Sequence, residues 1–419
     1  MKPLPCRRLS LVMFALLGWF FAQAHGETLK LETWRIDDEE RWNQQIIPAF
    51  KRSHPSIQLL TLPSPPTEYD TGLSDKFSKK AAGDLITCRP FDQSLDLYNK
   101  GYLLDITAMP ELRRFRSQSK LAWTTYYADR VFCMPVAAVM TGFFYNTRIF
   151  KELNLSPPQT QEELFAVLEK IQKSNKYLPL AFGTGDTWQS SQVLFAGIGP
   201  NHWNGEQGRI NLLTGRAKFT DPAYVDTWRV MAKLADYLPQ NHEEIGENGA
   251  RQLFLSGQAA IYPAGSWEIP FLSEHSNAKH FDVFAPPPKE IKHDCYVLNH
   301  LDIGVGINAH TKHTEEARAF LSWLSTKEFS QVLVNSLHGF FPLSSYPVSI
   351  TNPLASEMAS WRQQCDTTIR INSQFLNEAW PDLEHSLRDV SARVMRKKIS
   401  PEDAAREISN GIETWFKPF

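Results

Sequence analysis

The sequence predicts an α/β protein of two lobes, each a mostly parallel sheet flanked by helices, with strands that cross between the lobes. The first observation is length, because about 395 residues follow a predicted leader and one hydrophobic core rarely holds so many. The second is that strand-like and helix-like segments alternate, which favours parallel strands with helical crossovers. The third is the extended run 131–145, which is long enough to pass from one lobe to the other.

The first 24 residues predict a cleavable signal peptide. Its basic start holds Lys2, Arg7 and Arg8. The apolar run 9–21 is shorter than the roughly 20 residues that cross a bilayer, and Ala22-Gln23-Ala24 is a typical cleavage signal. Cys6 precedes the apolar run, so no lipid anchor is expected. The mature protein is therefore predicted to reach the periplasm of a two-membrane bacterium.

The start of the mature chain predicts a βαβα series. Residues 29–34 alternate like a strand, and Asp37 lies where it can cap the helix that follows. The next segments are a strand at 57–62, a loop that opens at 63–66, a helix that runs to Gly83, a buried strand at 85–88 and a loop at 89–92.

The most informative stretch is 248–272. A short helix is expected to stop at Ser256-Gly257, and a buried strand follows at 259–262. Gly265 then lets the backbone leave the strand at an angle that most residues resist. The turn sets Trp267 at the carboxyl end of a strand, where open α/β sheets bind their ligands.

These segments divide the chain after the leader 1–24. Lobe 1 is expected to span 25–136 and to be completed by 303–325, and lobe 2 to span 139–300 and to be completed by 330–419. In lobe 2, Thr160-Gln-Glu-Glu163 is a capping box at a helix start, and Ser400-Pro401 opens the last helix.

Composition limits the possible partners. Without the three basic residues of the leader, 41 basic residues face 46 acidic ones, for a formal charge of −5. A nucleic-acid partner would require a basic surface and is not expected. Aromatic residues make up 12% of the chain, which suits stacking on a saccharide.

Four cysteines follow the leader, at positions 88, 133, 295 and 365. Export permits disulfides, and four cysteines allow three connectivities. Cys88 and Cys133 both lie in apparent strands of lobe 1, which favours that pair, with free buried thiols as the alternative. No C-x-x-C pair is present, so a tetracysteine metal site is not expected.

Six segments occur in an order that resembles a known family. They are 50–55 (Phe-Lys-Arg-Ser-His-Pro), 100–107, 134–148, 157–164, 254–267 and 304–321. The order is similar to that of bacterial extracellular solute-binding proteins, the sugar-binding class that includes maltose-binding protein. This resemblance covers nearly the whole mature chain and implies a type II periplasmic-binding-protein fold that closes on its ligand by a hinge. The family's Gly-x-x-Pro-Asp-Val strand entry is replaced here by 83–88, so the loop 89–92 aligns less securely.

The resemblance also implies where ligand contacts lie. Tryptophan rings at strand ends cover the apolar face of a sugar, and charged groups hydrogen-bond its hydroxyls. The candidate ligand-binding residues are Trp34, Asp37, Asp38, Glu68, Tyr69, Arg89, Asp92, Asp186, Trp188, Ser266, Trp267 and Trp380. Their alternative roles are core tryptophans, helix caps and surface ion pairs.

Enzymatic interpretations have little support in the sequence. P-loop, H-E-x-x-H and G-x-S-x-G motifs are absent, and no cofactor is expected. The histidines at 293, 310 and 313 are better explained as solvated loop residues than as metal ligands. A glycoside hydrolase needs two acids facing each other. Asp92 and Asp186 are conceivable as such a pair, but nothing near them indicates a raised pKa.

The resulting hypothesis is a monomeric periplasmic carbohydrate-binding protein that serves the permease of an ABC importer. Two alternatives keep the fold. The protein could present its ligand to a receptor or kinase as a sensor. It could also import another solute, such as a glycerol phosphodiester, a polyamine or a metal complex. A phosphate ligand would require a cluster of arginine and lysine residues between the lobes.

Overall fold

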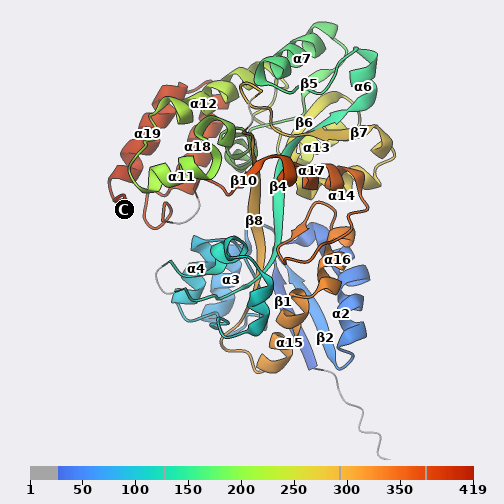
Figure 1. Cartoon of the computed structure of the whole chain (residues 1–419), viewed down its shortest axis with the longest axis vertical. Coiled ribbons are helices and arrows are strands. Elements are labelled where there is room, and N and C mark those ends of the chain that lie inside the picture. The colour runs from blue at the N-terminus through green and yellow to red at the C-terminus, as the bar shows by residue number, and fades with distance from the viewer. Residues whose placement is uncertain (1–26, 127–128, 292–293, 373–374) are drawn as a thin grey trace, which may run out of the picture.

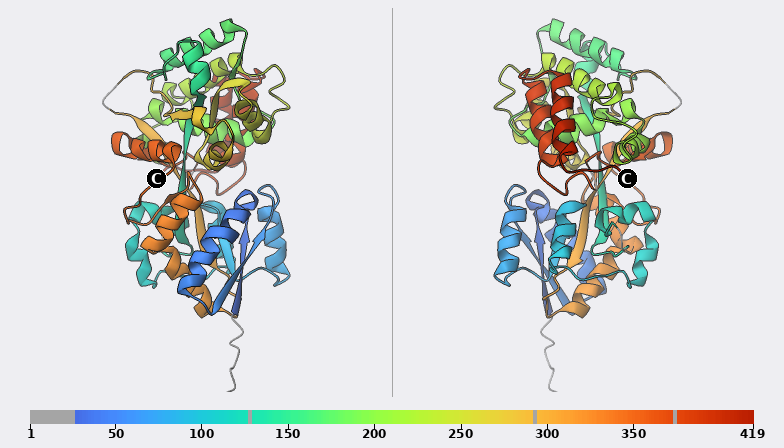
Figure 2. Two further views of the ribbon diagram at one scale, coloured as in Figure 1. Left: turned by 90° about the vertical axis from the view of Figure 1, so that its right-hand side faces the viewer. Right: turned by 90° about the vertical axis from the view of Figure 1, so that its left-hand side faces the viewer.

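The computed structural model describes residues 27–126, 129–291, 294–372 and 375–419. The predicted leader lies outside the described residues. Within this part of the chain, no helix combines the length and apolar character that spanning a bilayer requires. The described chain forms two lobes joined by long strands, as Figure 1 shows, and Figure 2 shows the same division from two sides. The predicted two-lobed α/β fold is confirmed.

Lobe 1 is built on a sheet with the strand order β2-β1-β3-β8. The first three strands are parallel, and β8 joins β3 antiparallel. The strands are β1 (Glu27–Thr33), β2 (Ile57–Pro63), β3 (Leu85–Cys88) and β8 (Tyr296–Ile307). The main helices are α2 (Ile47–Ser53), α3 (Tyr69–Ser78), α4 (Asp92–Asn99), α15 (Thr314–Leu324) and α16 (Lys327–Ser336).

Lobe 2 contains a smaller sheet and more helices. Its strands are β5 (Leu178–Leu180), β6 (Ala259–Gly265) and β7 (Phe281–Phe284). Helices named below are α7 (Gln161–Ser174), α8 (Thr187–Gln189), α11 (Gly205–Leu213), α13 (Glu247–Leu255), α18 (Leu383–Met395) and α19 (Pro401–Glu413). The π-helix η5 (Ser190–Phe195) continues α8.

The strand β4 (Met134–Asn146) belongs to both lobes. Its residues 134–140 pair with β8, and its residues 141–146 pair with β6 and β7. At about 3.3 Å per residue the strand extends for roughly 40 Å, enough to connect two lobes without a turn. The predicted crossing run thus becomes one strand. Because β4 runs antiparallel to β6, β7 and β8, the sheets are mixed rather than mostly parallel.

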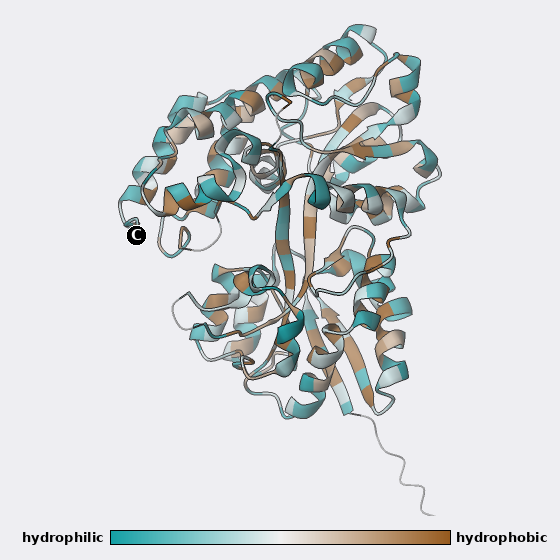
Figure 3. Ribbon diagram, in the orientation of Figure 1, coloured by the Kyte–Doolittle hydropathy of each residue, from teal (hydrophilic) through white to brown (hydrophobic). Residues whose placement is uncertain are grey.

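The hydrophobic cores follow this division. Residues from both chain halves form the lobe 1 core, among them Phe329, Leu333 and Phe340. Residues 329–343 therefore pack with lobe 1, although the sequence placed everything after 330 in lobe 2. Figure 3 shows hydrophobic residues along the strands, and helices on which hydrophilic and hydrophobic residues alternate, as expected for amphipathic helices over an apolar sheet.

The segment 369–371 lies where the two lobes meet. Ile369 packs against the core of lobe 1 and Ile371 in a core of lobe 2, so Arg370 stands at the junction between the lobes. The short strand β10 (Asp366–Thr368) directly precedes it and pairs with the start of β8. The strand β10 and the preceding helix α17 (Pro353–Gln364) lie with lobe 2. The two crossing strands β4 and β8, together with the junction segment 369–371, are called the hinge below.

Local sequence signals produce several elements as predicted. The Thr160 side chain accepts a hydrogen bond from the Glu163 backbone N–H and caps α7, and Ser400 caps α19 in the same manner. Each cap satisfies one backbone donor that the first helical turn leaves unpaired.

Two disulfides are present in the described chain. Cys88 bonds to Cys133, which confirms the favoured pair, and both residues are fully buried in lobe 1. Cys295 bonds to Cys365 and links the chain just before β8 to the chain just before β10. The first bond ties the end of β3 to the residue that precedes β4.

The double variant Cys88→Ala/Cys133→Ala should lower the free energy of unfolding by about 2–4 kcal/mol, because the bond closes a loop of 45 residues that the unfolded chain would otherwise explore. Chemical denaturation monitored by circular dichroism measures the difference, with Cys295→Ser/Cys365→Ser as the comparison variant. An unchanged denaturation midpoint would contradict a stabilising role for the buried bond.

Candidate functional site

Three predicted residues meet at the carboxyl ends of the lobe 1 strands. Trp34 follows β1, and its ring contacts Tyr69 edge-on at a centroid distance of 5.4 Å. The guanidinium of Arg89, just after β3, lies 4.6 Å from the centre of the Trp34 ring. Parallel strands end at the same edge of the sheet, which is why residues so far apart in sequence come together.

The lobe 1 candidates differ in how accessible they are to a ligand. The Tyr69 hydroxyl is buried and donates to the Thr87 carbonyl at 2.8 Å. Asp38 is buried and bonded to the Arg35 guanidinium at 2.5 Å. Asp37 and Glu68 are exposed, and Glu68 lines a hollow beside the start of α3. Trp34 is itself buried in the lobe 1 core, with 5% of its surface exposed, and the partly exposed Arg89 covers its ring.

Trp188 and Trp267 lie side by side in lobe 2. Their ring centroids are 6.0 Å apart, and both rings are partly exposed. Trp188 packs against the core of lobe 2, whereas Trp267 packs against the cores of both lobes. Trp267 is thus an aromatic surface at the junction between the lobes.

A chain of hydrogen bonds orients Trp267. Its indole N–H donates to the Glu247 carboxyl at 2.8 Å. The backbone N–H of Glu247, the first residue of α13, donates to the predicted site residue Asp186 at 2.7 Å. Behind this chain, Glu268 is fully buried and accepts two bonds from Arg251 at 2.5 and 2.8 Å. Asp186 therefore holds the start of α13, whose first residue Glu247 orients the tryptophan.

Gly265 is required for a different reason than the sequence suggested. Its φ of −89° and ψ of 163° are extended values that any residue adopts. A Cβ atom at this position, however, would lie 1.9 Å from the Trp267 ring. The glycine makes room for the indole, which folds back over the strand end.

Ser266 is a buried structural residue. Its hydroxyl accepts from the Met140 backbone N–H at 3.1 Å and donates to the Gly339 carbonyl at 2.5 Å. Gly339 has a φ of +90°, and a Cβ there would meet the Ser266 carbonyl oxygen at 1.9 Å. Ser266 thereby ties lobe 2 to β4 and to the loop after α16.

Asp92 bridges the lobes. It accepts hydrogen bonds from Tyr126 of its own lobe and, at 3.1 Å, from Asn377 of lobe 2. Burial raises the pKa of the Asp92 carboxyl, and the bonds from Tyr126 and Asn377 partly offset this. Nothing in the sequence had indicated this raised pKa. Beside this bridge, the rings of Tyr126 and Phe375 lie 4.2 Å apart.

Trp380 remains apart from these groups. It is 73% exposed, and its ring contacts His385 at 5.5 Å. Sequence reasoning missed Glu247, Tyr126 and Asn377. The acidic residue directly before the stretch 248–272 was the available signal for Glu247. Nothing in the sequence indicated the contacts of Tyr126 and Asn377.

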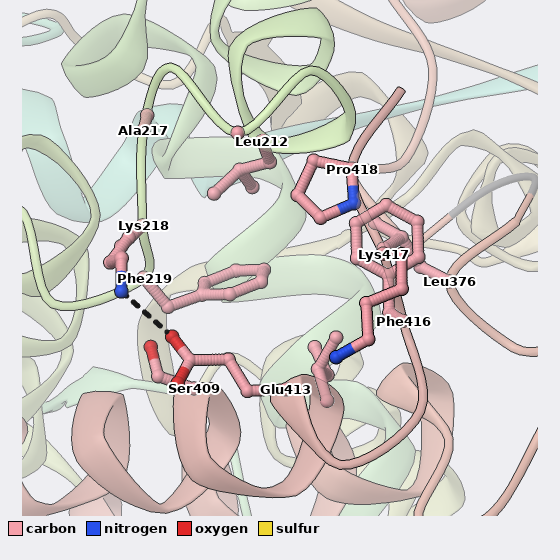
Figure 4. Close-up of a pocket in the computed structure, with 12 residues that line it drawn as sticks. Leu212, Ala217, Lys218, Phe219, Leu376, Ser409, Glu413, Phe416, Lys417 and Pro418 are labelled. Carbon is pink, nitrogen blue, oxygen red and sulfur yellow. Dashed lines mark hydrogen bonds and ion pairs between the residues drawn. The ribbon is translucent and has the colours of Figure 1, made fainter.

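A cavity of about 350 Å³ lies in lobe 2 between α11, α19 and the end of the chain (Figure 4). Phe219, Ile412 and Phe416 line it, and the ion pair between Lys218 and Glu413, at 3.0 Å, closes one edge. None of the predicted site residues borders this cavity, so we define the candidate site by the strand ends instead. Among the described residues, no group of three or more His, Cys, Asp or Glu side chains is arranged to hold a metal ion.

The model of a family described as bacterial extracellular solute-binding protein matches residues 36–330, well over half of the chain. The protein belongs to this family. It is a solute-binding protein and not an enzyme, because the members of the family are binding proteins of transporters.

A curated relative of this solute-binding protein is the multiple sugar-binding protein of Streptococcus mutans. It is 24% identical over 392 residues, which cover 90% of this chain and 86% of the relative. A solved structure from a study of xylan utilisation by Caldanaerobius polysaccharolyticus has a TM-score of 0.78 at 17% identity, covering 91% and 99% of the two chains. The solute-binding protein RafE in complex with raffinose has a TM-score of 0.76 at 18% identity, covering 92% and 99%.

The carboxyl of Glu247 gives this solute-binding protein a testable pH response. Burial and the neighbouring Glu268 raise the pKa of Glu247 to about 7, although the Trp267 N–H lowers it. The folded state therefore holds this proton more tightly than the unfolded state. The resulting stability is complete below about pH 4.5 and is lost as the pH rises through about 7.

The variant Glu247→Gln should remove this response, because its amide does not titrate. The melting temperature of the wild type should fall relative to that of Glu247→Gln between pH 5 and 7.5, by the equivalent of up to about 3 kcal/mol. Differential scanning calorimetry measures both proteins, with the exposed Glu244→Gln as control. Parallel curves for wild type and Glu247→Gln would contradict the assignment.

Proposed function

We propose that the protein is the periplasmic carbohydrate-binding component of an ABC importer, exported by removal of residues 1–24. It holds a sugar between its lobes and delivers it to a membrane permease. The supporting observation is the placement of the partly exposed rings of Trp188 and Trp267 in lobe 2, together with the partly exposed Arg89 at the strand ends of lobe 1. Trp267 directly follows β6 and packs against the cores of both lobes.

The chemistry of a sugar suits this arrangement. The C–H faces of a pyranose ring are apolar, and burying them against an indole contributes roughly 25 cal/mol for each Å² removed from water. Buried hydroxyls, in turn, require hydrogen-bonding partners. The name of the Streptococcus mutans relative and the raffinose held by a structural neighbour support a sugar as the ligand.

Closure of the lobes would allow the permease to distinguish the ligand-bound protein from the free protein. A ligand that touches both lobes only in the closed form stabilises that form by its differential affinity. Periplasmic binding proteins are a standard example of this type of hinge motion. Trp267, which packs against both cores, is the group through which closure and ligand contact would be linked.

The first test is a thermal-shift screen against a panel of five neutral sugars, which are raffinose, xylotriose, chitotriose, maltotriose and galactose, followed by calorimetry on the best binder. A ligand at 100 times its Kd adds about 2.7 kcal/mol of stability. No shift with any member of the panel would contradict the proposal.

Trp267→Ala should weaken binding of the best panel sugar by about 1–3 kcal/mol, because a buried aromatic contact is lost. Trp267→Phe should lose less, since a smaller ring still stacks. Trp415→Phe is the matched control, because Trp415 is a partly exposed tryptophan of the same lobe whose N–H donates to the Pro381 carbonyl at 3.0 Å. Unchanged affinity in Trp267→Ala would place the ring outside the ligand site.

A further inference from the structure

The hinge carries a cluster of polar side chains without hydrogen-bond partners. Three of them, Asn299, His300 and Asp302, lie on β8, and the fourth is Arg370 of the junction segment 369–371. Within the described chain, Asn299 Oδ1, both ring nitrogens of His300 and Arg370 Nε have no hydrogen-bond partner. Asp302 likewise makes no hydrogen bond or ion pair in that part of the molecule.

Such a cluster is unusual in a folded protein. Most buried polar groups are paired, and a buried donor or acceptor left unpaired costs about 1–3 kcal/mol. His300 is only 2% exposed, so its ring nitrogens do not face open solvent. Asp302 and Arg370 are partly exposed, so a bound molecule can reach them. Unpaired groups at a functional site often form their hydrogen bonds only when a ligand binds.

Charges of both lobes surround Arg370. Asp302 and Glu384 act on it as neighbouring anions, and Arg89 and Arg388 as neighbouring cations. Arg89 belongs to the lobe 1 strand ends, where it covers Trp34. Glu384 belongs to α18 of lobe 2 and accepts a hydrogen bond from Gln192 of η5, the helix that continues α8. Arg370 therefore has charged neighbours from both lobes of the candidate site.

Asp302 stands in the same region. The guanidinium groups of Arg35, Arg370 and Arg89 are its neighbouring cations. Two of them are already engaged, because Arg35 bonds to Asp38 at 2.5 Å and Arg89 to Asp70 at 3.0 Å. Arg370 is the cation left without an ion pair among the described residues, beside a carboxylate that also has none.

The two groups complement a sugar hydroxyl. A guanidinium only donates hydrogen bonds and a carboxylate only accepts them, whereas a hydroxyl does both. Hydrogen bonds to such charged partners are about twice as strong as neutral ones. The pair carries no net charge, so it favours a neutral polyol over a phosphate ester, whose charge Asp302 would repel.

We propose that Asp302 and Arg370, with His300 beside them, form the hydroxyl-binding centre of the ligand site on the hinge. This inference rests on the proposed function and assigns its polar contacts to the hinge, in addition to the loops that the sequence suggested. Neighbouring hydroxyls of one sugar ring would donate to the Asp302 carboxylate and accept from the Arg370 guanidinium.

The electrostatics agree with this placement. Burial lowers the pKa of Arg370 to about 10, against the opposing effect of Glu384 and Asp302. Burial raises the pKa of Asp302, against the effect of its three arginine neighbours. Both side chains thus bear a desolvation cost in the free protein, and hydroxyl partners supplied by a ligand would offset part of it.

The experiment uses Asp302→Asn and Arg370→Gln in the full chain, titrated with the five panel sugars. We expect each variant to bind the best panel sugar at least tenfold more weakly than the wild type. The melting temperature of the ligand-free variants should stay equal or rise, because each substitution removes an unpaired, desolvated charge. A merely structural ion pair would instead lower it. Asp105→Asn and Arg130→Gln, an exposed pair 3.3 Å apart in lobe 1, are the matched controls.

The outcomes separate this inference from the proposed function. If the wild type binds a panel sugar and Trp267→Ala weakens it while Asp302→Asn and Arg370→Gln bind normally, the hinge centre is overturned and sugar binding stands. If no panel sugar binds the wild type, both fail. Tighter binding of glycerol 3-phosphate than of every panel sugar would also overturn the neutral-polyol assignment.

Discussion

The backbone ladder between β4 and β8 is the constraint on which the rest of the molecule depends. β4 forms hydrogen bonds with β8 over its first half and with β6 and β7 over its second half. The two sheets are therefore continuous, and the same pair of strands positions the loops of both lobes.

The register of the pairing between β4 and β8 shifts between Pro135 and Ala138, where the ladder is interrupted. An interrupted ladder bends more easily than a regular one, so this point is where we expect the lobes to move.

Around this ladder, recognition is divided between the lobes and their junction. Lobe 2 offers the partly exposed rings of Trp188 and Trp267, and lobe 1 offers Arg89, which covers the buried Trp34. Polar groups without partners lie on β8 and on the junction segment 369–371. In our account the lobes supply apolar area and the hinge supplies hydrogen bonds. A ligand then gains its full interaction only when both lobes approach it, which favours the closed form.

The sequence predicted the features that depend on neighbouring residues. The Thr160 cap, the run that became β4 and the Gly-x-Trp turn all follow from patterns of a few residues.

The sequence predicted contacts between distant parts of the fold less well. Residues 329–343 pack with lobe 1 because the chain leaves that lobe only between α16 and α17, and no local pattern marks this crossing. The bond between Asp92 and Asn377 joins residues 285 positions apart. The hinge residue Arg370 follows a strand of only three residues, too short to leave a periodic signal.

Small-angle X-ray scattering tests the central claim, which is that a sugar is held between two lobes that close on it. Scattering is recorded from the mature protein alone and with a saturating amount of the panel sugar that binds best. The account predicts a smaller radius of gyration with sugar, and a smaller change when Arg370 is replaced by Gln at the same sugar concentration. Identical scattering curves with and without a sugar that calorimetry shows to be bound would contradict it.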